Sequence, residues 1–185
     1  MIVKNAPVHY PPQEGLTCGE ANIKGILEGF NIPYRPSKSP RLRIGLWGYS
    51  FVQDISEALE IHGLYAPISH ANHLPDQEKL AVIKGHIDND EPVLLAIGNG
   101  YLQRGVYTPI ARYFFGHFIT IYGYSDEEES FYIYDPYLKD KYPGEIPAGN
   151  ETRSFYELLR DWQGPLYYKL IGIDHVYIPS GIHDK

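Results

Sequence analysis

The chain has 185 residues, enough for one domain with a single hydrophobic core and too few for two domains of ordinary size. Hydrophobic residues make up 43% of it and charged residues 21%, a composition that excludes a mainly disordered protein. The formal net charge of −7 argues against DNA or RNA as a partner, because nucleic-acid binders need a positive surface that attracts phosphate.

Cysteine content and hydropathy restrict the possibilities further. The single cysteine, Cys18, excludes an intramolecular disulfide and a zinc site with several thiolates. Residues 1–7 contain no apolar run long enough for a signal peptide, and no stretch approaches the roughly 20 apolar residues that span a bilayer. We therefore expect a cytoplasmic protein that does not associate with membranes.

The first half of the chain is predicted to be mainly helical. Apolar stripes at helical spacing run from Ile23 to Phe30 and from Phe51 to Leu59. Ser50 is expected to cap the second helix. The elements expected here are a helix over 18–31, a helix over 50–62 that Gly63 stops, a short strand over 65–69 and a helix over 76–89.

The second half is predicted to consist mainly of strands. Residues 92–97 form a continuous apolar run of strand length, which is expected in the middle of a sheet. The other elements expected here are strands over 117–124, 131–135, 167–173 and 175–178 and a helix over 154–162. Helices lead and strands follow, so the predicted fold class is α+β with a mainly antiparallel sheet, in a single domain covering residues 1–185.

Two segments are predicted to be irregular. Residues 34–48 are basic and rich in Pro and Ser, and residues 98–116 carry glycines and aromatic rings without a clear period. Substrate choice is expected to reside in their portions 35–47 and 101–115. The alternative is that both are ordinary surface loops with a few rings tucked onto the core.

Cys18 is expected at the start of the first helix. There the positive end of the helix dipole and the free N–H groups favour the thiolate, which is the nucleophilic form. Gly19 is expected to leave open space beside the sulfur and to expose backbone to a bound carbonyl group. The alternative is that a lone free cysteine behaves as a small buried hydrophobic residue.

His117 and Asp135 are predicted to face each other across a hairpin. A turn centred on Asp126 places residue 117 opposite residue 135. Opposed Cβ atoms lie about 4.5–5.5 Å apart, so the carboxylate would accept a hydrogen bond from the imidazole and fix its tautomer. Alternatively, His117 is a strand-end histidine, and Asp135, which precedes Pro136, is an ordinary turn residue.

Together with Gln13, these residues match the needs of nucleophilic acyl transfer. A sulfur that attacks a carbonyl carbon needs a base, a group that orients the base, and donors for the oxygen that becomes negative. Cys18, His117 and Asp135 would be the nucleophile, the base and the orienting group. The Gln13 side-chain amide and the Cys18 backbone N–H would form the oxyanion hole.

The same motifs resemble those of the bacteriocin-processing (double-glycine leader) cysteine peptidases of the papain-like superfamily. The matching pieces are QEGLTCGEANIKGIL at 13–27, the apolar strand at 92–97, GHFITIYGY at 116–124 and YIYDPY at 132–137. The resemblance implies a papain-like fold in which N-terminal helices pack on the antiparallel sheet that carries the base. It also implies Gln13 as oxyanion donor, Cys18 as nucleophile, His117 as base and Asp135 as orienting group.

The predicted function is that of a cysteine peptidase or amidase that acts on a peptide or an acylated small molecule through a thioester intermediate. An acyltransferase with an amine acceptor and a non-catalytic peptide-binding module are the alternatives. Thr17 stands where transporter-linked relatives often carry an acidic or amide residue, a departure that concerns leader cleavage and not the acyl chemistry. Zinc at His70 and His73 or calcium at 127–129 is disfavoured by incomplete ligand patterns, so no cofactor is expected. The oligomeric state is left open.

Overall fold

The computed structural model describes residues 1–10, 12–15, 17–36, 50–103, 106–138 and 146–182. A large β-sheet forms the centre of the fold. The sheet is six-stranded, in the order β1-β8-β2-β5-β6-β7, and all neighbouring strands are antiparallel. Its strands are β1 (Ser69–His70), β2 (Val93–Gly98), β5 (Gly116–Ser125), β6 (Ser130–Tyr134), β7 (Glu151–Ser154) and β8 (Val176–Pro179).

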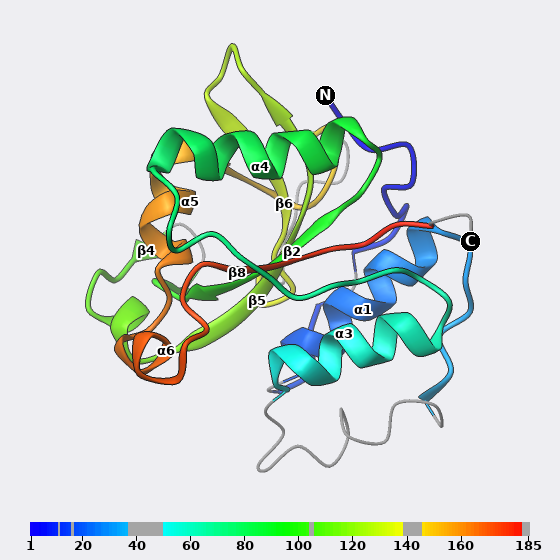
Figure 1. Cartoon of the computed structure of the whole chain (residues 1–185), viewed down its shortest axis with the longest axis horizontal. Coiled ribbons are helices and arrows are strands. Elements are labelled where there is room, and N and C mark those ends of the chain that lie inside the picture. Colours follow the sequence, from blue (N-terminus) through cyan, green and yellow to red (C-terminus); the bar gives the residue numbers. More distant parts are fainter. Residues whose placement is uncertain (11, 16, 37–49, 104–105, 139–145, 183–185) are drawn as a thin grey trace.

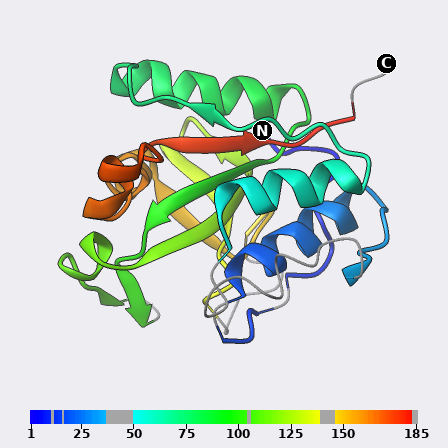
Figure 2. The ribbon, with the colours of Figure 1, turned by 60° about the horizontal axis from the view of Figure 1, so that its bottom comes forward.

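Helices cover both faces of this sheet (Figure 1). They are α1 (Cys18–Gly29), α3 (Val52–Ile61), α4 (Asp76–Asp88), α5 (Phe155–Trp162) and α6 (Leu166–Ile171). The turned view in Figure 2 shows α4 above the sheet and the neighbouring helices α1 and α3 below it. The predicted α+β class, with N-terminal helices packed on an antiparallel sheet, is confirmed.

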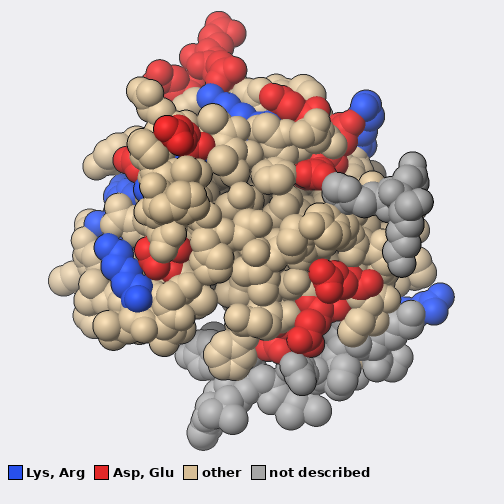
Figure 3. All heavy atoms as spheres, in the orientation of Figure 1, with Lys and Arg blue, Asp and Glu red and all other residues tan. Residues whose placement is uncertain are grey.

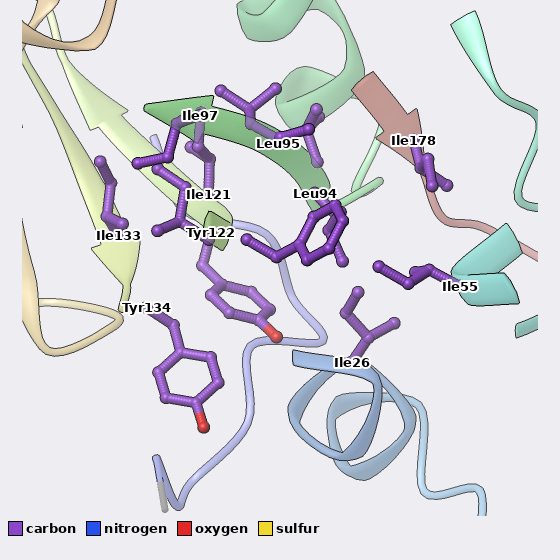
Figure 4. Close-up of a cluster of buried hydrophobic side chains, with 14 of the residues drawn as sticks. Ile26, Ile55, Leu94, Leu95, Ile97, Ile121, Tyr122, Ile133, Tyr134 and Ile178 are labelled. Atoms are coloured by element: carbon purple, nitrogen blue, oxygen red, sulfur yellow. The ribbon is translucent and has the colours of Figure 1, made fainter. Parts of the chain in front are cut away.

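The central strand β2 explains why the core has two sides. All six residues of β2 are buried between β8 and β5, as expected from the apolar run at 92–97. In Figure 4, Leu94 points toward Ile26 of α1 and Ile55 of α3, whereas Leu95 points toward the opposite face. Because both faces of the strand are covered, its apolar residues run continuously instead of alternating with polar ones.

The prediction of a strand over 167–173 was wrong, because this stretch forms the short helix α6. Its aromatic and apolar residues favour a strand locally. However, Pro165 caps the helix at its start, and Gly172 ends it in the left-handed conformation with φ +71°. The exposed side chains of Leu166 and Leu170 lie on this helix.

Other elements differ from expectation in extent. Within 98–116, predicted to be irregular, the structure has β3 (Tyr101–Gln103), β4 (Val106–Tyr107) and a short 3₁₀ helix, η3 (Ala111–Tyr113). The polar edge strand β7 was not expected, and the strand predicted over 65–69 is reduced to β1. The N-cap of α3 is Phe51 instead of Ser50. Most of segment 35–47 lies outside the described residues.

Charged side chains on the face drawn in Figure 3 lie mainly around its rim, and the centre is uncharged. No helix within the described ranges combines the length and hydropathy needed to cross a bilayer.

Truncation of the central strand should destabilise the fold strongly. Leu95 is fully buried, so Leu95→Ala should lower the free energy of unfolding by about 2–5 kcal/mol through lost burial and a cavity. Leu170 on α6 is 86% exposed, so the matched change Leu170→Ala should alter it by no more than about 0.5 kcal/mol. Urea unfolding of both variants measures this difference, and equal losses would contradict the assignment of β2 to the core.

Candidate active site

Cys18 is the first residue of α1, and this free cysteine is a partly buried residue. The preceding N-cap residue, Thr17, does not cap the helix with its side chain. Instead, its hydroxyl donates to the carbonyl oxygen of Glu14 at 2.8 Å. The Thr17 side chain therefore leaves the backbone N–H groups of the first turn of α1 uncapped beside the thiol.

The structure brings His117 and Asp135 into direct contact. Nε2 of His117 lies 2.7 Å from Oδ1 of Asp135, and a carboxylate only accepts hydrogen bonds, so Nε2–H is the donor. Both side chains are buried, with residue exposures of 3% and 0%. The His117 ring also forms a hydrogen bond with the Cys18 thiol. Since Nε2 faces the carboxylate, Nδ1 is the nitrogen left for the sulfur.

The strand register that led to this pair was wrong, although the contact itself is present. The ladder between β5 and β6 pairs Ser125 with Ser130 and Thr120 with Tyr134, and its register shifts between Ile121 and Gly123. Residue 135 therefore does not lie opposite residue 117. The hydrogen bond forms because Asp135 follows the end of β6 and reaches back toward the first residues of β5.

The three side chains shift one another's pKa values. Burial by itself raises the pKa of the Cys18 thiol, but the hydrogen bond and charge of His117, with backbone hydrogen bonds from Phe118 and Gly19, bring it below its usual value. Burial lowers the pKa of His117, but the charge and hydrogen bond of Asp135, followed by those of Cys18, raise it well above its usual value. Both shifts favour a thiolate beside an imidazolium.

The Asp135 carboxylate and backbone are held from several sides. Oδ1 also accepts the Tyr137 backbone N–H at 2.9 Å, and Oδ2 accepts Nη2 of Arg153 at 2.5 Å. The Asn150 side chain accepts the Asp135 N–H at 2.8 Å and donates to its carbonyl at 3.3 Å. Gly149 precedes Asn150 with φ +79°, where a Cβ would lie 2.2 Å from the carbonyl oxygen of Ile133, so this approach requires glycine.

Asn22 joins the cysteine helix to the histidine strand, and sequence reasoning missed it. The side chain is fully buried, and its Nδ2 donates at 2.8 Å to the carbonyls of both Cys18 and Phe118. Its Oδ1 accepts the Thr120 hydroxyl at 2.6 Å. The β5–β6 ladder ends at Thr120, and Asn22 of α1 supplies a hydrogen bond to β5 at Phe118, beyond the end of that ladder. A polar residue among buried apolar positions of α1 was the available signal.

Gln13 lies near Asp135, but its side chain is engaged within its own loop. Its backbone N–H donates to the carbonyl of Pro136 at 2.8 Å, and its Nε2 donates to the carbonyl of Gly15 at 2.6 Å. Oε1 of Gln13 is buried without a hydrogen-bond partner. No contact recorded among the described residues joins the Gln13 side chain to Cys18.

A cavity of about 430 Å³ opens beside this loop and the first turns of α1. Its lining residues are Pro12, Gln13, Glu14, Thr17, Glu20, Ala21 and Lys24. Across the cavity wall, Glu20 pairs with Lys24 at 3.1 Å. The cavity is therefore mostly polar and adjoins the residue that precedes the thiol.

The expected open space at Gly19 is absent. A Cβ there would lie 2.8 Å from Cβ and Oγ of Ser50, so the glycine permits α1 to approach the segment before α3. Gly116, directly before His117, is crowded in the same way by the hydroxyl groups of Tyr167 and Tyr168 from α6. Both glycines serve close packing around the cysteine and the histidine.

The aromatic segment 101–115 is partly attached to α5. Tyr101 donates its hydroxyl hydrogen bond to Glu157 at 3.0 Å, and Tyr107 donates to Asp161 at 2.8 Å. Phe114 and Phe115 stay more than half exposed. As for metal ions, no cluster of three or more His, Cys, Asp or Glu side chains suited to binding one occurs in the part of the chain that the structure describes.

Comparisons with known proteins concern the family and the fold. The model of the Peptidase_C39 like family matches residues 45–163, which include His117 and Asp135 and begin after Cys18. No curated protein sequence matches the chain.

Two solved structures are similar over nearly the whole chain. A double glycine motif protease from an AMS/PCAT transporter, in complex with the leader peptide, has a TM-score of 0.56 at 16% identity and covers 98% of each chain. The peptidase domain of Streptococcus ComA, a bi-functional ABC transporter involved in quorum sensing, has a TM-score of 0.58 at 15% identity and covers 95% of this chain and 100% of the other. These likenesses confirm the expected papain-like fold.

Alkylation of the thiol tests the pairing with His117. At pH 6 a free thiol of pKa about 8.5 is almost wholly protonated, whereas a lowered pKa increases the thiolate fraction of Cys18. Iodoacetamide should therefore modify Cys18 at least about tenfold faster than a free thiol at this pH. His117→Ala should abolish the difference. Intact-mass kinetics measure both rates, and equal rates in the two proteins would contradict the pairing.

Loss of the Asn22 amide should loosen the junction between α1 and β5. Asn22→Leu leaves the Phe118 carbonyl and the Thr120 hydroxyl buried without this partner, at a cost of about 1–3 kcal/mol for each unsatisfied group. Addition of Thr120→Val removes one of those groups, so the double variant should lose less than the sum of the single losses. Chemical denaturation measures the cycle, and additive losses would argue against the hydrogen bond.

Proposed function

Since this chain belongs to the Peptidase_C39 like family, we propose that it acts as a cysteine peptidase or amidase in which Cys18, His117 and Asp135 form the reacting triad. The family supports a peptidase-like enzyme in general terms. We propose further that residues 1–185 form a single domain of this kind, because both similar structures align with nearly all of the chain.

The contact that carries this proposal is the buried hydrogen bond between His117 and Asp135, with the Cys18 thiol on the same ring. In the proposed reaction the Cys18 thiolate attacks the carbonyl carbon of the scissile bond. The His117 imidazolium then gives its proton to the leaving amine, and a thioester to Cys18 remains. Water, deprotonated by the now neutral His117, attacks the thioester and releases the acid and the thiolate.

The oxyanion of each tetrahedral intermediate needs hydrogen-bond donors. The uncapped N–H groups of the first turn of α1, beginning with that of Cys18, suit this task, since they lie next to the sulfur. Gln13 is the proposed side-chain donor. Its Nε2 carries a second hydrogen besides the one directed to Gly15, and its backbone is tied to Pro136 beside the triad.

The proposed substrate is a peptide or peptide-like amide. One of the similar proteases is bound to a leader peptide, and in this chain a polar cavity adjoins Thr17 directly before the thiol. Of the three proposed triad residues, Cys18 is partly exposed whereas His117 and Asp135 are buried, so we expect a substrate to reach the triad at Cys18. Transfer of the acyl group to an amine is the second outcome that the same thioester allows.

Intact-mass spectrometry with peptide and thioester libraries tests the function and its outcome. We expect an acyl adduct on Cys18 that decays to free enzyme and acid in water. Asp135→Asn should slow acylation by orders of magnitude because it favours the wrong imidazole tautomer, and Gln13→Ala should slow it by about 10²-fold or more.

Cys18→Ala should form no adduct and serves as the control for acylation elsewhere. Decay that requires an added amine would assign an acyltransferase instead. Peptide binding without any adduct on the wild-type protein, together with an ordinary alkylation rate, would identify a non-catalytic binding module.

A further inference from the structure

Asp135 lies between two basic side chains, and only one of them belongs to the proposed triad. Its Oδ1 accepts Nε2–H of His117, and its Oδ2 accepts Nη2–H of Arg153. Arg153, on the edge strand β7, is 1% exposed. A buried guanidinium loses its hydration, so it is tolerated only where charged or polar partners replace water.

The partners of Arg153 hold it firmly. Its Nε donates to Oε2 of Glu151 at 2.9 Å, and its guanidinium lies over the Tyr101 ring, 4.7 Å from the centroid. The Tyr101 hydroxyl is in turn bonded to Glu157 at the start of α5. Arg153 thus connects β7, β3 and α5 to the carboxylate that contacts His117.

We propose that Arg153 is a positioning residue of this site: it fixes the Asp135 carboxylate with Oδ1 toward His117, and its charge sets the pH range in which Cys18 and His117 remain a pair of ions. The proposal rests on the proposed function. Because Arg153 binds Oδ2, the Asp135 carboxylate cannot rotate away from His117. The imidazole therefore keeps the orientation that directs Nδ1 to the sulfur.

The order of charges gives the sign of the effect. From the sulfur outward, thiolate, imidazolium, carboxylate, guanidinium and the Glu151 carboxylate alternate in sign. Loss of the Arg153 charge makes nearby protons harder to remove, so thiolate formation and imidazolium deprotonation both move to higher pH. Loss of the Glu151 charge moves both to lower pH.

Other ionisable groups face this chain of charges from the packed elements. They are Tyr137 beside the His117 ring, Tyr167 and Tyr168 of α6, and Tyr101, Glu157 and Asp161 around Arg153. Burial raises the pKa of Tyr168, and burial with the charge of Glu157 raises that of Tyr101 to about 12. Burial raises the pKa of Glu157, but hydrogen bonds with Ser154 and Tyr101 and the charge of Arg160 together bring it below its usual value. These three groups therefore keep their charge states between pH 5 and 9, where the test is made.

The test uses the chain of residues 1–185 and measures the pH profile of Cys18 alkylation by iodoacetamide. It also measures the pH profile of turnover on any peptide or thioester that acylates Cys18 in the library experiment. The acid limb of this profile is the range in which the rate rises with pH as Cys18 becomes a thiolate. Arg153→Gln should move this limb to higher pH by about half a unit or more, and Glu151→Gln should move it to lower pH. Arg153→Lys, which keeps the charge, should restore most of the limb's position. Arg160→Gln is the matched control, because Arg160 pairs with Asp161 and not with Asp135, and its profile should match the wild type.

Each outcome has a defined meaning. If Arg153→Gln folds and its acid limb does not move, the proposal is overturned. An unmoved acid limb in Glu151→Gln would overturn it as well, and this variant is the test if Arg153→Gln does not fold. A shift in Arg160→Gln equal to that in Arg153→Gln would also overturn it, since any cation would then suffice. If wild-type Cys18 reacts like an ordinary thiol, the proposed function itself fails, which is distinct from these results.

Discussion

A carboxylate with no solvent exposure, Asp135, is the constraint around which this structure is built. A buried charge of this kind is tolerated only if ionic and hydrogen-bonding partners replace the lost water. His117 and Arg153 lie against its two oxygens, the Tyr137 N–H donates to one of them, and the Asn150 side chain forms hydrogen bonds with the backbone of the same residue. The segment after β6 and the strands β5 and β7 therefore converge on one side chain.

A second junction determines whether the thiol meets this carboxylate-bound ring. The pairing of β6 with β5 ends at Thr120, and Asn22 of α1 bonds to β5 at Phe118, beyond that point. Asn22 donates to the buried carbonyl of Phe118 and to that of Cys18 with one amide group. The same approach explains the packing requirement at Gly19, because a side chain there would push α1 away from the segment that leads into α3. These contacts hold the first turn of α1 beside the first residues of β5, where the Cys18 thiol neighbours the His117 ring.

The surroundings of the site couple it to parts of the chain that look peripheral. The hairpin of β3 and β4 places Tyr101 over Arg153 and Tyr107 over Arg160, and both tyrosines also bond to acidic residues of α5. Its rings thus serve in part to shield a buried ionic network from water, which strengthens the charges inside it. Phe114 and Phe115 remain exposed, and a role for them in substrate choice stays a prediction.

Local pattern in the sequence determined the helices α1, α3, α4 and α5, the buried central strand and the hairpin of β5 and β6, because each has a period or an apolar run long enough to outweigh its neighbours. The stretch at 167–173 misled the same reasoning, since its composition favours a strand while Pro165 and Gly172 delimit a helix. The polar strand β7 carries no apolar signal, because it lies at the sheet edge.

For the site, the sequence singled out Gln13, Cys18, His117 and Asp135 by residue type and order, and the structure gathers Cys18, His117 and Asp135 in one contact chain. What only the tertiary structure decided is how they meet. A bulge and the turn geometry give the β5–β6 pair a register that differs from the predicted one. Distant residues, Asn22, Asn150 and Arg153, supply the hydrogen bonds that the buried groups require. Such partners are chosen by proximity in space after folding, and proximity between residues far apart in the chain leaves no periodic trace in a single sequence.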